Sequence, residues 1–197
     1  MNICVFCSSS NAISEVYFQE ARNLGTLIGK GSHMLINGGA NVGLMEAVTI
    51  AASEAGARTV GIIPEKMIHR SLASGNAHEV IVTPDMMERK AKMRDMSDAF
   101  IALPGGFGTL EEILEVMTLR QLSYHSKPIV FINTNHFFDH LFRQFERSYD
   151  EKFAKEVYKK LYYVAVNAEE AMEHILNYTE VELDSKWFTV PEKSKKE

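Results

Sequence analysis

Short apolar runs alternate along this chain with longer stretches in which apolar residues recur at helical spacing. The apolar runs predict strands at residues 3–7, 34–36, 59–63, 79–82, 99–103, 128–132 and 162–166. The helical spacing predicts helices at residues 14–28, 44–56, 85–96, 109–122, 137–149 and 168–176, with a loop and a short helix between residues 65 and 78. This alternation predicts a doubly wound α/β fold, a mostly parallel sheet with helices on both faces.

Several helix ends can be assigned from individual residues. Ser14 and Asp85 are expected to cap the first and third of the main helices. Gly29 and Gly31 are expected to end the first helix, and Gly56 the second.

The length and composition favour one domain with a short tail. A chain of 197 residues suffices for one well-packed α/β domain, which we place at residues 1–178 with a C-terminal extension at 179–197. The net charge of −5 and the scattered basic residues argue against a nucleic-acid partner. No apolar run approaches the ~18 residues that span a bilayer, and no signal peptide is evident, so we expect no membrane partner and a cytoplasmic location.

Three loops with candidate binding residues follow predicted strands. They are Ser8-Ser9, Gly38-Gly39 and residues 105–109. Because parallel strands end at one edge of a sheet, and ligands bind where the strand order reverses, these loops are expected to form one site. Neither glycine loop matches G-x-G-x-x-G well, and no acidic residue stands at the end of the second strand to bind a ribose. A mononucleotide is therefore favoured over a dinucleotide.

The loop at residues 101–112 (IALPGGFGTLEE) has the strongest chemical pattern. Its glycines let the backbone approach a ligand closely, and a helix expected to begin at Thr109 would present free amides to an anion such as phosphate. No Lys-Ser/Thr follows the glycines, so a magnesium-bound triphosphate is not favoured. A structural explanation also exists, because Thr109 and Glu112 fit a capping box.

Residues that often carry redox or metal chemistry have structural interpretations here. Cys4 and Cys7 form a lone C-x-x-C within the first apolar run, where buried thiols are favoured over a redox or zinc site. His136 and His140 flank a helix boundary and do not predict a metal site. Met86, Met87, Met93 and Met96 are expected to pack against the sheet or to line a pocket rim.

Residues 86–93 (MMERKAKM) together with 104–112 (PGGFGTLEE) resemble the LONELY GUY (LOG) family of cytokinin riboside 5′-monophosphate phosphoribohydrolases, often labelled lysine decarboxylases. They match the family's M-x-x-R-K-x-x-M and P-G-G-x-G-T-x-x-E. The resemblance covers about the first 175 residues. It implies a Rossmann-like fold and a homodimer with pockets near the subunit interface, and it calls for no cofactor and no metal.

The resemblance also implies an activity, hydrolysis of the N-glycosidic bond of a nucleoside 5′-monophosphate to the free base and ribose 5-phosphate. Arg89 and Glu112 match the catalytic pair. The positions expected to bind substrate are Ser8, Ser9, Gly38, Gly39, Lys90, Gly105, Gly106, Phe107, Gly108, Thr109, Leu110, Glu111 and Thr118.

The chain departs from the family pattern at positions that bear on specificity. Asn37 stands at a usual tyrosine, Ala40 and Glu46 stand at usual glycines, Ser71 at a usual acid, and Leu119 at a usual tryptophan. Plain AMP and an N6-isoprenyl AMP both stay open as substrates. A non-hydrolytic carrier resembling the molybdenum-cofactor carriers is the alternative function, although a carrier has no need of Arg89 and Glu112. A pyridoxal-phosphate decarboxylase is disfavoured because no lysine lies in the glycine loop.

Overall fold

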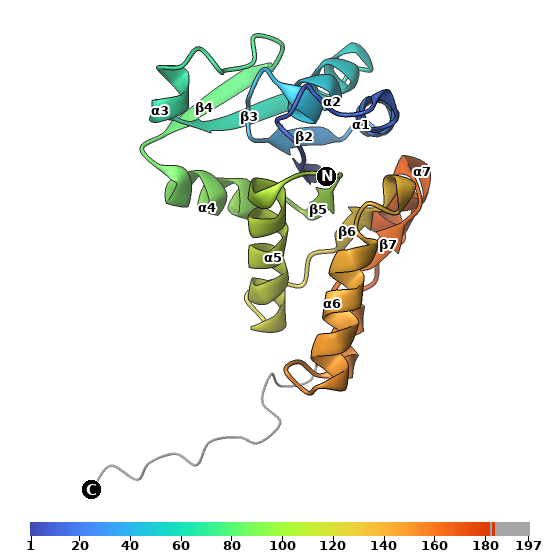
Figure 1. Ribbon diagram of the computed structural model, residues 1–197. Coiled ribbons are helices and arrows are strands. Elements are labelled where there is room, and N and C mark those ends of the chain that lie inside the picture. Colours follow the sequence, from blue (N-terminus) through green and yellow to red (C-terminus); the bar gives the residue numbers. More distant parts are fainter. Residues whose placement is uncertain (182, 184–197) are drawn as a thin grey trace, which may run out of the picture.

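A computed structural model describes residues 1–181 and 183, so most of the expected C-terminal extension lies outside the described residues (Figure 1). The described residues form one seven-stranded parallel sheet, which confirms the predicted fold class. Its strands are β1 (Asn2–Phe6), β2 (Met34–Asn37), β3 (Arg58–Pro64), β4 (Glu79–Thr83), β5 (Ala99–Ala102), β6 (Ile129–Ile132) and β7 (Tyr163–Ala165).

The strand order places a reversal at the centre of the sheet. The order is β4-β3-β2-β1-β5-β6-β7, so the chain first builds outward from β1 and then returns to build the other half. β1 pairs with β2 on one side and with β5 on the other, both in parallel register. The point where the order reverses therefore lies between β1 and β5, and the loops that follow these two strands meet there.

Helices cover both faces of the sheet, as the alternating pattern predicts. Buried residues of α1 (Glu15–Lys30), α2 (Gly43–Glu54) and α7 (Ala168–Leu176) pack on the face that holds Ile3 and Val5. Those of α4 (Met86–Met96) and α5 (Phe107–Gln121) pack on the face of Cys4 and Phe6, where α6 (Asp139–Asp150) also lies. Figure 1 shows α4 running across the upper end of α5, and ion pairs join the two helices.

One predicted helix end is wrong. Gly31 caps α1, but Gly29 lies inside the helix and is buried. A Cβ atom at Gly29 would lie 2.5 Å from the Ala55 Cβ, and one at Gly25 would lie 2.6 Å from the Val48 carbonyl oxygen. These glycines are needed for close packing of α1 on α2, which explains why the helix tolerates them despite their low helical propensity.

The start of α5 also differs from the prediction. The helix begins at Phe107 with Gly106 as its N-cap, two residues before Thr109, and no side chain caps it. The extended backbone of Gly106 (φ −88°, ψ −153°) provides the turn, so Thr109 and Glu112 form no capping box. Their side chains are instead available to the loop and to the cavity that it borders.

The remaining differences are small. The helix expected at residues 137–149 is α6, which is preceded by the 3₁₀ turn η1 (Thr134–His136), and a second 3₁₀ segment, η2 (Glu156–Leu161), was not predicted. The short helix between β3 and β4 is α3 (Glu65–Ile68). None of the described helices is long and apolar enough to cross a membrane.

Candidate functional site

A cavity of about 760 Å³ lies at the carboxyl ends of β1, β2 and β5, within the size range of small-molecule sites. All three loops predicted to meet at this edge contribute to it. Its lining residues are Cys7, Ser8, Ser9, Ser10, Gly38, Ala40, Val42, Met45, Ile63, Pro64, Met67, Leu72, Met86, Arg89, Gly106, Phe107, Gly108, Thr109 and Glu112.

Arg89 reaches the cavity from the first turns of α4. The Asp85 side chain accepts hydrogen bonds from the Met87 and Glu88 amides at 2.8 and 2.9 Å, so this residue caps the helix as predicted. Arg89 is 8% exposed, and its Nε donates to the Ile62 carbonyl oxygen of β3 at 3.0 Å. The guanidinium is thus fixed by the backbone of a neighbouring strand.

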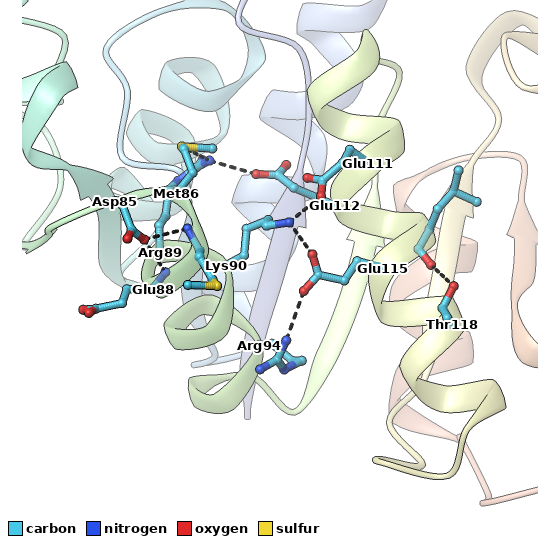
Figure 2. Close-up of polar contacts among 12 residues, drawn as sticks. Asp85, Met86, Glu88, Arg89, Lys90, Arg94, Glu111, Glu112, Glu115 and Thr118 are labelled. Carbon is cyan, nitrogen blue, oxygen red and sulfur yellow. Dashed lines mark hydrogen bonds and ion pairs between the residues drawn. The ribbon is translucent and has the colours of Figure 1, made fainter.

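Glu112 approaches the same point from α5. Its Oε1 lies 3.0 Å from Arg89 Nη1, and the residue is 9% exposed (Figure 2). Burial raises the pKa of Glu112, and the Arg89 guanidinium offsets part of that rise. The structure therefore joins the two predicted catalytic residues in one buried ion pair at the cavity wall.

The N-terminus of α5 forms the third part of the site. The first backbone bond of this helix runs from the Leu110 amide to the Gly106 carbonyl at 3.1 Å, so the amides that precede Leu110 have no acceptor within the helix. Gly106, Phe107, Gly108 and Thr109 all line the cavity. Free amides and the positive end of the helix dipole make this end a suitable site for an anion.

Two glycines allow the polypeptide to pack closely around this site. A Cβ atom at Gly105 would lie 2.1 Å from Thr109 Oγ1, so the loop could not keep its shape with a larger residue there. Gly43 has a φ of +59°, and a Cβ atom at that position would lie 2.5 Å from the Ser8 carbonyl oxygen. That carbonyl accepts a 2.9 Å hydrogen bond from the Leu44 amide, which joins the first and second loops.

Comparison with known proteins agrees with this geometry. Residues 45–175 match a family model described as "Possible lysine decarboxylase". The chain is 38% identical over 179 residues to cytokinin riboside 5′-monophosphate phosphoribohydrolase LOG5 of Arabidopsis thaliana, which covers 91% of this chain and 78% of that protein. It is 37% identical to LOG2 of the same plant, over 89% of this chain and 83% of that protein. The chain belongs to the LONELY GUY (LOG) family.

Solved structures of proteins named for molybdenum cofactor binding have the same fold. The molybdenum cofactor binding protein of Rippkaea orientalis matches with a TM-score of 0.69 and 28% identity, over 89% of this chain and 94% of that one. A molybdenum cofactor carrier protein of Chlamydomonas reinhardtii matches at 22% identity with a TM-score of 0.66, over 89% of this chain and 95% of that one, which shows the fold alone.

The LOG-family positions fall into two groups in this structure. Those that line the cavity with Arg89 and Glu112 are Ser8, Ser9, Gly38, Gly106, Phe107, Gly108 and Thr109. Those that lie outside its lining are Gly39, Lys90, Gly105, Leu110, Glu111 and Thr118. Gly39 and Gly105 shape the loops, and the others lie on α4 and α5, with Thr118 in the second half of α5, away from the cavity.

Lys90 and Glu111 form an ion network on the outside of α4 and α5. Lys90 Nζ pairs with Glu111 and Glu115, and Arg94 Nη1 lies 3.1 Å from Glu115 Oε1 (Figure 2). Thr118 is exposed, and its hydroxyl donates to the Leu114 carbonyl at 2.8 Å. These residues bind substrate only if the ligand or a second subunit reaches this surface.

The apolar part of the cavity was largely missed by sequence reasoning. Met45, Ile63, Pro64, Met67 and Leu72 line it, together with Met86, which was expected at a pocket rim. Spacing within one helix could not reveal this wall, because its residues come from β3, α2, α3, α4 and a loop. Pro64 ends β3 and Met67 follows it, so a wall at that strand end could have been expected.

The other chemical candidates have structural roles. Both cysteines are free and buried, as predicted, and burial raises the pKa of the Cys7 thiol, which keeps it neutral at the cavity wall. The side chain of Asn37, where the family usually has tyrosine, accepts from the Gly39 amide and donates to Thr49, and so supports the second loop.

Within residues 1–181 and 183, no cluster of three or more His, Cys, Asp or Glu side chains could hold a metal ion. The cavity lining contains no lysine on which pyridoxal phosphate could be bound.

Because Gly38 has no side chain, the Arg89 guanidinium can lie against its backbone. This contact gives a first testable consequence. A Cβ atom at Gly38 would lie 2.0 Å from Arg89 Nη2, so Gly38→Ala must push the guanidinium away from Glu112. We expect kcat/KM for a nucleoside monophosphate to fall about 100-fold, because a small misplacement of a catalytic group is costly. Steady-state kinetics measure this. Gly75→Ala is the control, since a Cβ atom there meets nothing within 4 Å; equal losses in both variants would contradict the steric explanation.

Proposed function

We propose that this LOG-family protein hydrolyses the N-glycosidic bond of a nucleoside 5′-monophosphate, AMP or an N6-substituted AMP. The products are the free base and ribose 5-phosphate. The main observation behind this proposal is that the buried Arg89–Glu112 ion pair lines the same cavity as the free amides of the α5 N-terminus. The relatives' names, cytokinin riboside 5′-monophosphate phosphoribohydrolase, support the same chemistry.

The 5′-phosphate would bind at the α5 N-terminus. Amides of Phe107, Gly108 and Thr109 can donate to its oxygens, and the helix dipole favours the negative charge. This contact acts on a part of the substrate that does not react. Its binding energy therefore serves to position the sugar at the ion pair.

The sugar would then lie beside Arg89 and Glu112. Cleavage of a ribosyl–base bond builds positive charge on the sugar, as in other glycosidic hydrolyses. The Glu112 carboxylate can stabilise that charge or orient the attacking water, and the Arg89 guanidinium can hold phosphate or polarise the base. The water oxygen bonds to C1′, the C1′–N electron pair leaves with the base, and a proton from the water ends on the base.

The nucleobase would lie against the apolar part of the cavity lining. Ala40, Val42, Met45, Met67 and Leu72 supply apolar lining, which suits a flat aromatic ring and leaves apolar surface for a substituent. Methionine side chains adapt to ligands of different shapes. The wall is compatible with adenine and with an N6-isoprenyl adenine.

A homodimer is part of the proposal. Phe107, on α5, lines the cavity and is 93% exposed, and Met87, on α4, is 73% exposed. A second subunit would cover such apolar side chains and could bring residues to the substrate. Sedimentation equilibrium that gives a monomer mass at working concentration would contradict this part. The cytoplasm is the compartment that we propose.

A non-hydrolytic carrier is the second candidate, favoured by the similarity to the Rippkaea orientalis molybdenum cofactor binding protein. Incubation with AMP, N6-isopentenyl AMP, GMP and CMP, followed by chromatography for free base, separates the two functions. We expect adenine or its N6-substituted form to be released together with an equal amount of ribose 5-phosphate. Calorimetric binding of a nucleotide without release of base from any of the four would favour the carrier.

A further inference from the structure

Hydrogen bonds join the second loop to the wall of the cavity between α3 and β4. We define residues 69–78, which connect these two elements, as the rim segment. The Ser74 amide donates to the Gly39 carbonyl and the Asn41 amide to the Leu72 carbonyl, both at 2.8 Å. The Asn41 side chain also donates to the Ser71 carbonyl at 3.1 Å. Leu72 lines the cavity from the rim segment, and Met67 lines it from the preceding helix.

The carboxylate of Glu46, on α2, holds the second half of the rim segment. Glu46 Oε2 accepts from Ser74 Oγ and Glu46 Oε1 accepts from Asn76 Nδ2, each at 2.6 Å. Ser74 is 4% exposed, and its hydroxyl also accepts from the Asn76 amide at 3.1 Å. One side chain on a rigid helix therefore ties together two residues of the rim segment, directly beyond the residue that lines the cavity.

We propose that Glu46 is a positioning residue for the apolar end of the cavity. By holding the rim segment against α2, it fixes the location of Leu72 and so the space left for the nucleobase and its substituent. Both oxygens are needed, because Ser74 and Asn76 each donate to a different one. This proposal rests on the proposed function for its kinetic consequence but not for the contact itself.

The kinetic signature of such a role is a change in binding and not in chemistry. Glu46 lies outside the cavity lining that contains Arg89 and Glu112, and the free amides belong to the first turn of α5. If the rim segment is less firmly held, the affinity for the nucleobase falls, while Arg89 and Glu112 keep their geometry. We expect Glu46→Ala to raise KM about five-fold for N6-isopentenyl AMP while kcat stays within about two-fold. Glu46→Gln keeps one acceptor oxygen, and we expect an intermediate KM.

A double-mutant cycle with Asn76 separates the contact from an effect on the helix dipole. If the two residues act through one contact, adding Asn76→Ala to Glu46→Ala produces no further rise in KM. Glu54→Ala, an exposed position at the end of the same helix, is the matched control and is expected to match the wild type. A fall in kcat at constant KM, additive effects in the cycle, or an equal change in the control would overturn the proposal.

Amide hydrogen exchange tests the contact without any assumption about activity. We expect peptides that cover residues 71–77 to exchange about ten-fold faster in Glu46→Ala than in the wild type, with the rest of the chain unchanged. Unchanged exchange in these peptides would overturn the proposed role of Glu46 even if the enzyme is active. Absence of hydrolysis with every nucleotide, combined with faster exchange, would instead refute the proposed function and leave the contact in place.

Discussion

Glu112→Gln is expected to lower kcat/KM for AMP by about a thousand-fold or more, because it removes the negative charge that faces the developing positive charge of the sugar. The amide oxygen can still accept from Arg89 Nη1, which now lies 3.0 Å from the carboxylate, so the geometry of the wall is largely kept. We expect the free energy of unfolding to change by ~1 kcal/mol. Release of adenine, followed by chromatography, gives the rate, and urea denaturation gives the stability.

The control for this variant is Glu115→Gln on the same helix. Glu115 pairs with Lys90 and Arg94 outside the cavity, and those cations also pair with Glu111 and Asp95. We expect its activity to stay within about two-fold of the wild type, because Glu115 lies outside the cavity lining and its partly exposed ion pairs contribute little. A folded Glu112→Gln protein that retains full activity would remove Glu112 from the chemistry.

Arg89→Lys is expected to lower kcat/KM about 100-fold, although it conserves the charge. Arg89 donates to Ile62 through Nε and pairs with Glu112 through Nη1, and a single ammonium group cannot reproduce this planar arrangement. The same variant should shift the pH profile. Because the guanidinium lowers the pKa of Glu112 while burial raises it, a looser pairing lets that pKa rise further.

The sign of the shift follows from the carboxylate being the active form. Activity is lost as the pH falls through the pKa of Glu112, so the acid limb of kcat/KM should lie above the ordinary glutamate value of about 4.3 and move higher in Arg89→Lys. Steady-state kinetics between pH 4 and 8 measure it. The control is Arg94→Lys, in the outer ion network. An acid limb that does not move in Arg89→Lys would show that this ion pair does not set the titration of the active group.

The sequence predicted the fold class well because apolar runs and helical spacing are local signals. The strands and the helices from α1 to α7 lie within a few residues of their expected places, and Asp85 caps α4 as expected. Where the prediction failed, either a tertiary contact or a local turn decided the outcome. Gly29 continues α1 because α2 packs against it, and α5 begins at Phe107 because Gly106 provides the turn.

The site was only partly predictable for the same reason. Arg89 and Glu112 were assigned through their resemblance to the LOG family, but neither the bond from Arg89 to Ile62 nor the contact of Glu46 with Ser74 follows any local pattern, since these partners are 27 and 28 residues apart. The apolar wall combines side chains from several elements, so no single periodicity marks it. Glu46 was visible in the sequence only as a departure from a usual glycine.

The bond between Arg89 and the Ile62 carbonyl also bears on how a ligand is received. With Nε on a strand carbonyl, Nη1 on Glu112 and Nη2 against Gly38, the guanidinium has little rotational freedom before anything binds. Solvent dipoles around a free arginine would have to reorient as charge develops, whereas this one is already oriented by the protein. The free energy needed to orient the Arg89 guanidinium is therefore supplied when the chain folds and not when the substrate binds.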